Sequence, residues 1–73
     1  MMQTKFIIQM TTPGRPDLEY FFAGCKLGSN VFVLKKSKAK RYDFLEEADR
    51  DARTLAAVSK PDTFKVITVR CRT

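Results

Sequence analysis

Histidine and tryptophan are absent from this chain of 73 residues, which contains only two cysteines and three glycines. Without histidine, the chain lacks the side chain that most often transfers protons near neutral pH. Cys25 and Cys71 belong to no CxxC pair, so the ligands of a zinc site are missing. The glycines do not have the spacing of a phosphate-binding loop. The sequence therefore predicts a non-enzymatic protein that needs no metal and no cofactor.

Long hydrophobic runs are also missing. No stretch approaches the roughly 20 apolar residues of a membrane-spanning helix. The apolar run at residues 6–10 is too short for the hydrophobic region of a signal peptide. We therefore expect a cytoplasmic protein that does not bind a membrane. In that compartment Cys25 and Cys71 are expected to be reduced, buried thiols, with a disulfide between them as the alternative.

The apolar residues that are present suffice for one thin core. They make up 44% of the chain, and the length allows one domain over residues 1–73. A loop rich in Pro and Gly is expected over residues 12–17, and a short turn at residues 26–30 predicts an antiparallel hairpin. The last predicted strand is apolar on both parities, which is typical of a central strand. Strands are predicted at residues 4–11, 19–25, 31–34 and 64–71.

A change of hydrophobic period after residue 42 predicts one helix. Asp43 and Glu46 have the spacing of a capping box, with Asp43 as the N-cap. Pro61 cannot continue a helix, so the helix should end near Ser59. The sequence thus predicts an α+β fold of β-β-β-α-β order, in which one amphipathic helix covers a small antiparallel sheet. The apolar face of the helix consists of Leu45, Ala48, Ala52, Leu55 and Ala56.

Positive charge is concentrated in the connector before the helix. The net charge is +6, and five cations stand within the seven residues 35–41. Such a patch favours an anionic partner. The alternative interpretation is a solubilising loop, or lysines that protect a sheet edge from aggregation. The candidate partner-binding residues are Lys35, Lys36, Lys38, Lys40 and Arg41, extended by Arg15, Arg70 and Arg72.

Negative charge is concentrated in the predicted helix. Residues 43–53 hold five acids and two bases, a net charge of −3, so the rest of the chain carries +9. An acidic helix would repel DNA phosphates. No RNA-binding motif surrounds the consecutive aromatic residues Tyr20, Phe21 and Phe22. The sequence therefore favours an acidic surface of a protein complex as the partner, with nucleic acid as the alternative.

Three short motifs lie within residues 31–69. Ala39-Lys40-Arg41-Tyr42 has an Ala-x-x-aromatic pattern, Glu46-Glu47-Ala48 opens the helix, and residues 64–69 form the last strand. This arrangement resembles small uncharacterised bacteriophage and prophage proteins. The resemblance implies that Ala39 and Tyr42 fix the helix on the sheet. It also implies a host-takeover or anti-defence factor in the host cytoplasm, one that binds and inhibits or redirects a host complex such as RNA polymerase or a CRISPR effector.

Overall fold

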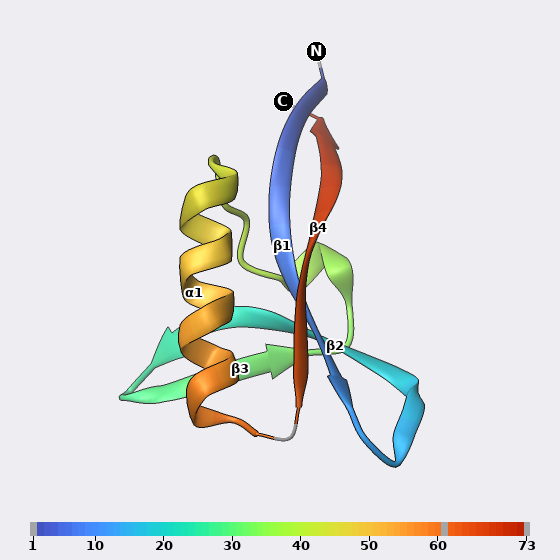
Figure 1. Cartoon of the computed structure of the whole chain (residues 1–73). Coiled ribbons are helices and arrows are strands. Elements are labelled where there is room, and N and C mark those ends of the chain that lie inside the picture. Colours follow the sequence, from blue (N-terminus) through green and yellow to red (C-terminus); the bar gives the residue numbers. More distant parts are fainter. Residues whose placement is uncertain (1, 61, 73) are drawn as a thin grey trace.

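The elements follow one another in the predicted order (Figure 1). The computed structural model describes residues 2–60 and 62–72. Pro61, the predicted helix stop, and the side chains of Pro16 and Arg72 lie outside the described part. The α+β fold is confirmed, and no helix in the described ranges is long and apolar enough to cross a bilayer. The elements are β1 (Met2–Thr12), β2 (Arg15–Lys26), β3 (Ser29–Val33), the short 3-10 helix η1 (Lys36–Lys38), α1 (Leu45–Val58) and β4 (Thr63–Arg72).

The strands are longer than predicted because the turns between them are tight. The expected loop over residues 12–17 is reduced to a turn at Pro13 and Gly14, where Gly14 has a φ of +87°. Leu27 and Gly28 form the turn between β2 and β3, with φ values of +53° and +80°. Positive φ at both central residues is the type I′ geometry, which matches the twist of a hairpin. The predicted antiparallel hairpin is confirmed.

The sheet has the strand order β3-β2-β1-β4, and every neighbouring pair is antiparallel. β4 is therefore an edge strand, and the prediction that it is central is wrong. β4 has apolar side chains on both of its faces because both faces of the sheet are covered. Phe64 and Val66 pack on the side of α1, whereas Ile67 and Val69 pack on the opposite side.

Two small hydrophobic clusters lie on the two faces of the sheet. Side chains alternate along a strand, so the consecutive residues Ile7 and Ile8 of β1 each enter a different cluster. Both are fully buried, with 0% exposure. The cluster on the helix side contains Ile8, Phe22, Tyr42, Ala48, Ala52 and Leu55. The cluster on the opposite side contains Ile7, Phe21 and Ala39.

The connector between β3 and α1 closes a gap between β1 and β2. These two strands pair only where residues 9–12 of β1 face residues 15–21 of β2, so the first half of β1 has no partner from β2. Tyr42 fills that place, because its N–H and C=O pair with those of Phe6 at 2.8 and 2.9 Å. The N–H of Lys40 donates to the carbonyl of Phe22 at 2.9 Å. The connector is therefore part of the sheet.

Ala39 and Tyr42 anchor this connector on opposite faces. Ala39 is 8% exposed and belongs to the cluster away from the helix, whereas Tyr42 belongs to the cluster beneath α1. The hydroxyl of Tyr42 donates to Oδ2 of Asp51 on α1 at 2.7 Å. Of the two residues that the resemblance assigned to holding the helix, only Tyr42 lies against it.

The helix begins one residue later than predicted. Phe44 is the N-cap, with extended backbone angles and no side-chain hydrogen bond, so the predicted cap by Asp43 is wrong. Asp43 instead forms an ion pair with Lys5 of β1, which draws the carboxylate away from the helix terminus. The end of the helix agrees with the prediction, since Ser59 is the C-cap and its N–H donates to the carbonyl of Leu55 at 2.9 Å.

Phe44→Ser should stabilise the chain, because Phe44 is 62% exposed and leaves the helix N-terminus without a side-chain acceptor. A serine at the N-cap places Glu47 at the third helical position, which completes a capping box. Phe44→Ala is the matched control, since alanine is a poor cap. We expect Phe44→Ser to exceed Phe44→Ala by about 1 kcal/mol in unfolding free energy, measured by urea denaturation. Equal stability of the two variants would show that the terminus needs no cap.

Tyr42→Phe should lower the unfolding free energy by about 1–2 kcal/mol near neutral pH, because it removes a hydroxyl that donates to a carboxylate. Burial, followed by the hydrogen bond and charge of Asp51, raises the pKa of Tyr42 above its ordinary value. As the pH rises above about 10, the unfolded chain releases this proton before the folded chain does, so stability falls. The advantage of the wild type over Tyr42→Phe should therefore shrink at alkaline pH. An advantage that stays constant in urea denaturation from about pH 7 to about pH 11 contradicts this.

Candidate functional site

Three of the predicted cations line one hollow on the surface. Lys36 and Arg41 line it from the connector, and Arg70 lines it from the end of β4, between Val69 and Cys71. The hollow has a volume of about 230 Å³. Residues that are far apart in the sequence are thus brought together by the way the connector folds back along the sheet. The described residues that line the hollow are Lys36, Ser37, Arg41, Val69, Arg70 and Cys71.

The backbone of the connector holds the cations in place. In η1 the N–H of Lys38 donates to the carbonyl of Lys35, and that of Ala39 donates to the carbonyl of Lys36, both at 3.1 Å. Ala39 then buries its methyl group in the cluster that contains Ile7. Because Ala39 lies between Lys36 and Arg41 and is anchored, both cations stand on a fixed backbone. Cations held in this way lose less conformational freedom when an anion binds.

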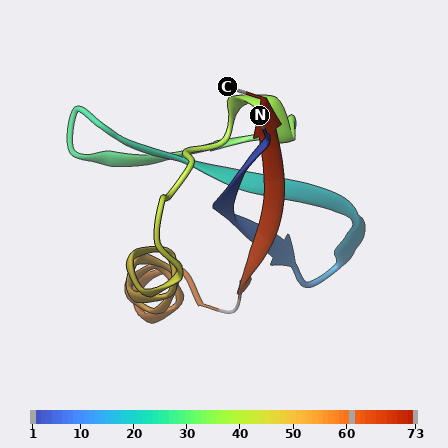
Figure 2. The same ribbon diagram turned by 90° about the horizontal axis from the view of Figure 1, so that it is seen from above.

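The hollow lies on the side of the molecule away from the acidic helix. Figure 2 shows α1 on one side of β1 and β4, and the segment around η1 on the other side. The ion pairs within the described residues are Lys5–Asp43 and Arg53–Asp49, and neither contains a cation of the hollow. Among the described residues, Lys36 and Arg41 therefore form no ion pair with a carboxylate, and their potential is available to a partner.

The remaining predicted residues are placed differently. The amine of Lys40 lies over the ring of Tyr42, 4.9 Å from its centroid, so Lys40 covers part of the core on the helix side. Lys35 directly precedes η1 and Lys38 is its last residue, and both are exposed. Arg15 is the first residue of β2 and is not among the described residues that line the hollow. The side chain of Arg72 lies outside the described part.

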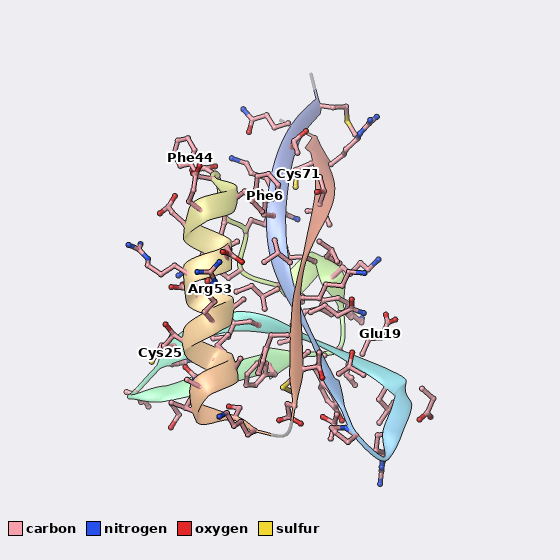
Figure 3. The ribbon with its side chains drawn as sticks, viewed as in Figure 1. Phe6, Glu19, Cys25, Phe44, Arg53 and Cys71 are labelled. Atoms are coloured by element: carbon pink, nitrogen blue, oxygen red, sulfur yellow. The ribbon has the colours of Figure 1, made fainter. Side chains whose placement is uncertain are left out.

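The two cysteines are free, as predicted, and lie on different elements. Cys25 is on β2 near the hairpin turn and Cys71 is on β4, well separated in Figure 3. The prediction that both thiols are buried is wrong, since Cys25 is exposed and Cys71 is half-buried. Sequence reasoning placed neither Cys71 nor Ser37 in a site, because only the folded connector brings them to Lys36 and Arg41.

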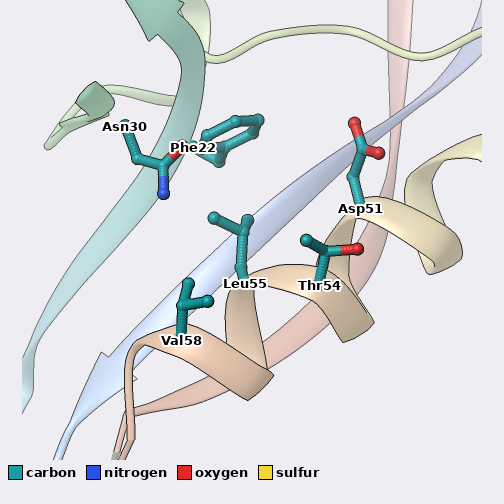
Figure 4. Close-up of a pocket in the computed structure, with 6 residues that line it drawn as sticks. All are labelled: Phe22, Asn30, Asp51, Thr54, Leu55 and Val58. Atoms are coloured by element: carbon teal, nitrogen blue, oxygen red, sulfur yellow. The ribbon is translucent and has the colours of Figure 1, made fainter. Parts of the chain in front are cut away.

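A second hollow, of about 180 Å³, separates α1 from the β2–β3 hairpin (Figure 4). Phe22 and Asn30 line it from the strands, and Leu55 and Val58 line it from the helix. Of the described residues in its lining, Asp51 alone is charged, and its carboxylate already accepts a hydrogen bond from the hydroxyl of Tyr42. This hollow therefore offers mainly apolar surface and lacks the cations of the first.

Ala39→Leu should destabilise the chain by about 1–3 kcal/mol, because Ala39 fits closely against the sheet and a larger side chain overpacks the cluster. Ser37→Leu is the matched control, since Ser37 is exposed and the same side chain costs less than about 0.5 kcal/mol there. Thermal denaturation of both variants measures the difference. If Ala39→Leu is as stable as Ser37→Leu, the connector is a loose loop and the hollow is not held in place.

Comparisons with protein families, with characterised proteins and with solved structures find no match to this chain. The resemblance to phage and prophage proteins therefore stays a prediction. Any function has to be argued from the placement of the chain's own residues, above all from the cations of the hollow.

Proposed function

We propose that this chain is a binding protein whose basic hollow contacts an acidic surface of a partner protein. The observation that carries the proposal is that Lys36 and Arg41 of the connector line one hollow together with the end of β4, on the side away from the acidic helix. Like charges repel, so holding Lys36 and Arg41 beside one hollow, with no ion pair to either among the described residues, costs free energy that an anionic partner relieves. A guanidinium group such as that of Arg41 binds a carboxylate through two parallel hydrogen bonds.

The lining of the hollow favours carboxylates over nucleic acid. Proteins that bind single-stranded nucleic acid stack bases on aromatic side chains. None of the described residues that line the hollow is aromatic, and the ring of Tyr42 is buried on the helix side. A long polyanion would also meet the acidic helix once it extended around the molecule. An acidic protein segment that ends beside the hollow avoids that repulsion.

Together with the phage resemblance, this surface leads us to propose a host macromolecular complex as the partner. A chain of 73 residues with one basic surface can act on a large complex by occupying an acidic contact that the complex needs. Inhibition or redirection of that complex follows from competition for the contact. The chain itself then carries out no chemistry.

The proposal is tested by reversing the charge of the hollow. Lys36→Glu combined with Arg41→Glu should abolish capture of the partner from host lysate and slow association, because electrostatic steering changes sign. Lys26→Glu combined with Lys60→Glu changes the net charge equally at exposed sites outside the hollow, and should retain the partner. Both variants should melt close to the wild type, since exposed charge changes each cost less than about 0.5 kcal/mol.

Nuclease treatment and competition separate the two classes of partner. A protein partner should stay bound after nuclease digestion, and random-sequence DNA should not displace it. Equal capture by the two charge-reversed variants contradicts the proposal. Loss of capture after nuclease treatment would show that the hollow binds nucleic acid instead.

A further inference from the structure

The outer edge of β4 is a row of backbone groups to which no other described strand pairs. β4 pairs with β1 over its whole length, Thr63–Arg72, in one continuous register, and among residues 2–60 and 62–72 no strand lies on its other side. Edge strands offer unpaired N–H and C=O groups to any extended chain that approaches them. In this chain the edge runs for ten residues and ends at the basic hollow.

The pairing pattern identifies which groups face outward. Phe6 directs its N–H and C=O to Tyr42, away from β4, although it stands opposite Thr68. When two opposite residues of antiparallel strands are not hydrogen-bonded to each other, both direct their N–H and C=O groups away from the partner strand. Thr68 therefore directs its N–H and C=O outward. Because the register is unbroken, the same holds for Phe64, Val66 and Arg70. No backbone partner for these four residues exists on that side within the described chain.

This edge carries few of the devices that usually block edge pairing. The described part of β4 contains no bulge against β1, its sequence has no proline, and ten residues is long for an edge. Its protection consists of positive charge, from the exposed residues Lys65 and Arg70. Positive charge repels a second copy of this chain, which carries +6 and the same cations. The same charge attracts an extended segment that is acidic.

We propose that an extended acidic segment of the partner protein adds to the sheet as a further strand along β4. Its backbone pairs with Phe64, Val66, Thr68 and Arg70. Where the added strand passes Val69 and Cys71, its carboxylates reach Lys36 and Arg41, because these residues line one hollow. Backbone pairing supplies affinity, and the cations supply selectivity for acidic side chains. This inference rests on the proposed function and specifies how the partner docks.

The first experiment uses a decapeptide that alternates glutamate with valine. We expect it to bind the wild-type chain and to slow hydrogen exchange of the outward amides of Val66, Thr68 and Arg70. A peptide of the same sequence with alternate backbone nitrogens methylated keeps every charge but cannot form a ladder. It should bind at least about tenfold more weakly, which corresponds to the loss of one or more hydrogen bonds. Equal binding of both peptides overturns the inference.

The second experiment changes one outward amide. Thr68→Pro removes the N–H at an exposed edge position that makes no bond to β1, where proline is tolerated. Thr68→Ala is the matched control and keeps the amide. We expect Thr68→Pro to lose peptide binding while Thr68→Ala stays within about twofold of the wild type. The hydrogen-exchange and peptide results on the wild-type chain decide the matter if Thr68→Pro fails to fold.

The outcomes separate this inference from the function on which it rests. If Thr68→Pro binds like Thr68→Ala while reversal of Lys36 and Arg41 abolishes binding, the basic surface stands and strand addition is wrong. If charge reversal also leaves peptide binding intact, the proposed function falls as well. Sedimentation of the free chain gives a further test, because a dimer that Thr68→Pro dissociates would make a second copy the occupant of the edge.

Discussion

The structure depends on the backbone pairing that inserts the connector between two diverging strands. Where β2 turns away from β1, Tyr42 pairs with Phe6 and Lys40 donates to Phe22. Unpaired backbone groups in this position would be costly, because they lie beside both hydrophobic clusters. The pairing fixes the direction of the chain from η1 to α1. The helix position, the buried Ala39 and the arrangement of the cations all follow from it.

Much of the fold could be predicted from local patterns. Runs of β-forming residues located all four strands, the short turn at residues 26–30 marked the hairpin, and helical spacing identified the buried residues Ala48, Ala52 and Leu55. The errors came from contacts between distant residues. Asp43 has the spacing of a cap, but Lys5, 38 residues earlier, draws it away. Apolar residues on both parities of β4 reflect two covered faces, a property that does not depend on strand order.

The candidate site was predictable only in part. Composition identified a basic connector, and charge counting separated it from the acidic helix. The sequence pattern could not show that Lys40 would lie over Tyr42 while Lys36 and Arg41 turned to the other side. That division depends on which connector residues pair with the sheet, a tertiary interaction. The sequence signal for a connector that packs on the sheet was Ala39 among five cations, because an alanine in a basic segment contributes nothing to solubility. Ala39 is buried in the structure.

The placement of Ile7 and Ile8 on opposite faces also limits how this chain can change in length. Each residue fills a different cluster, and neither leaves any surface exposed. An insertion or deletion of one residue in β1 would move every later side chain of that strand to the wrong face and break the pairing with β4 and Tyr42 together. Length variation should therefore be confined to the turns at Pro13–Gly14 and Leu27–Gly28. The sequence of β1 can therefore change by substitution, but not by insertion or deletion.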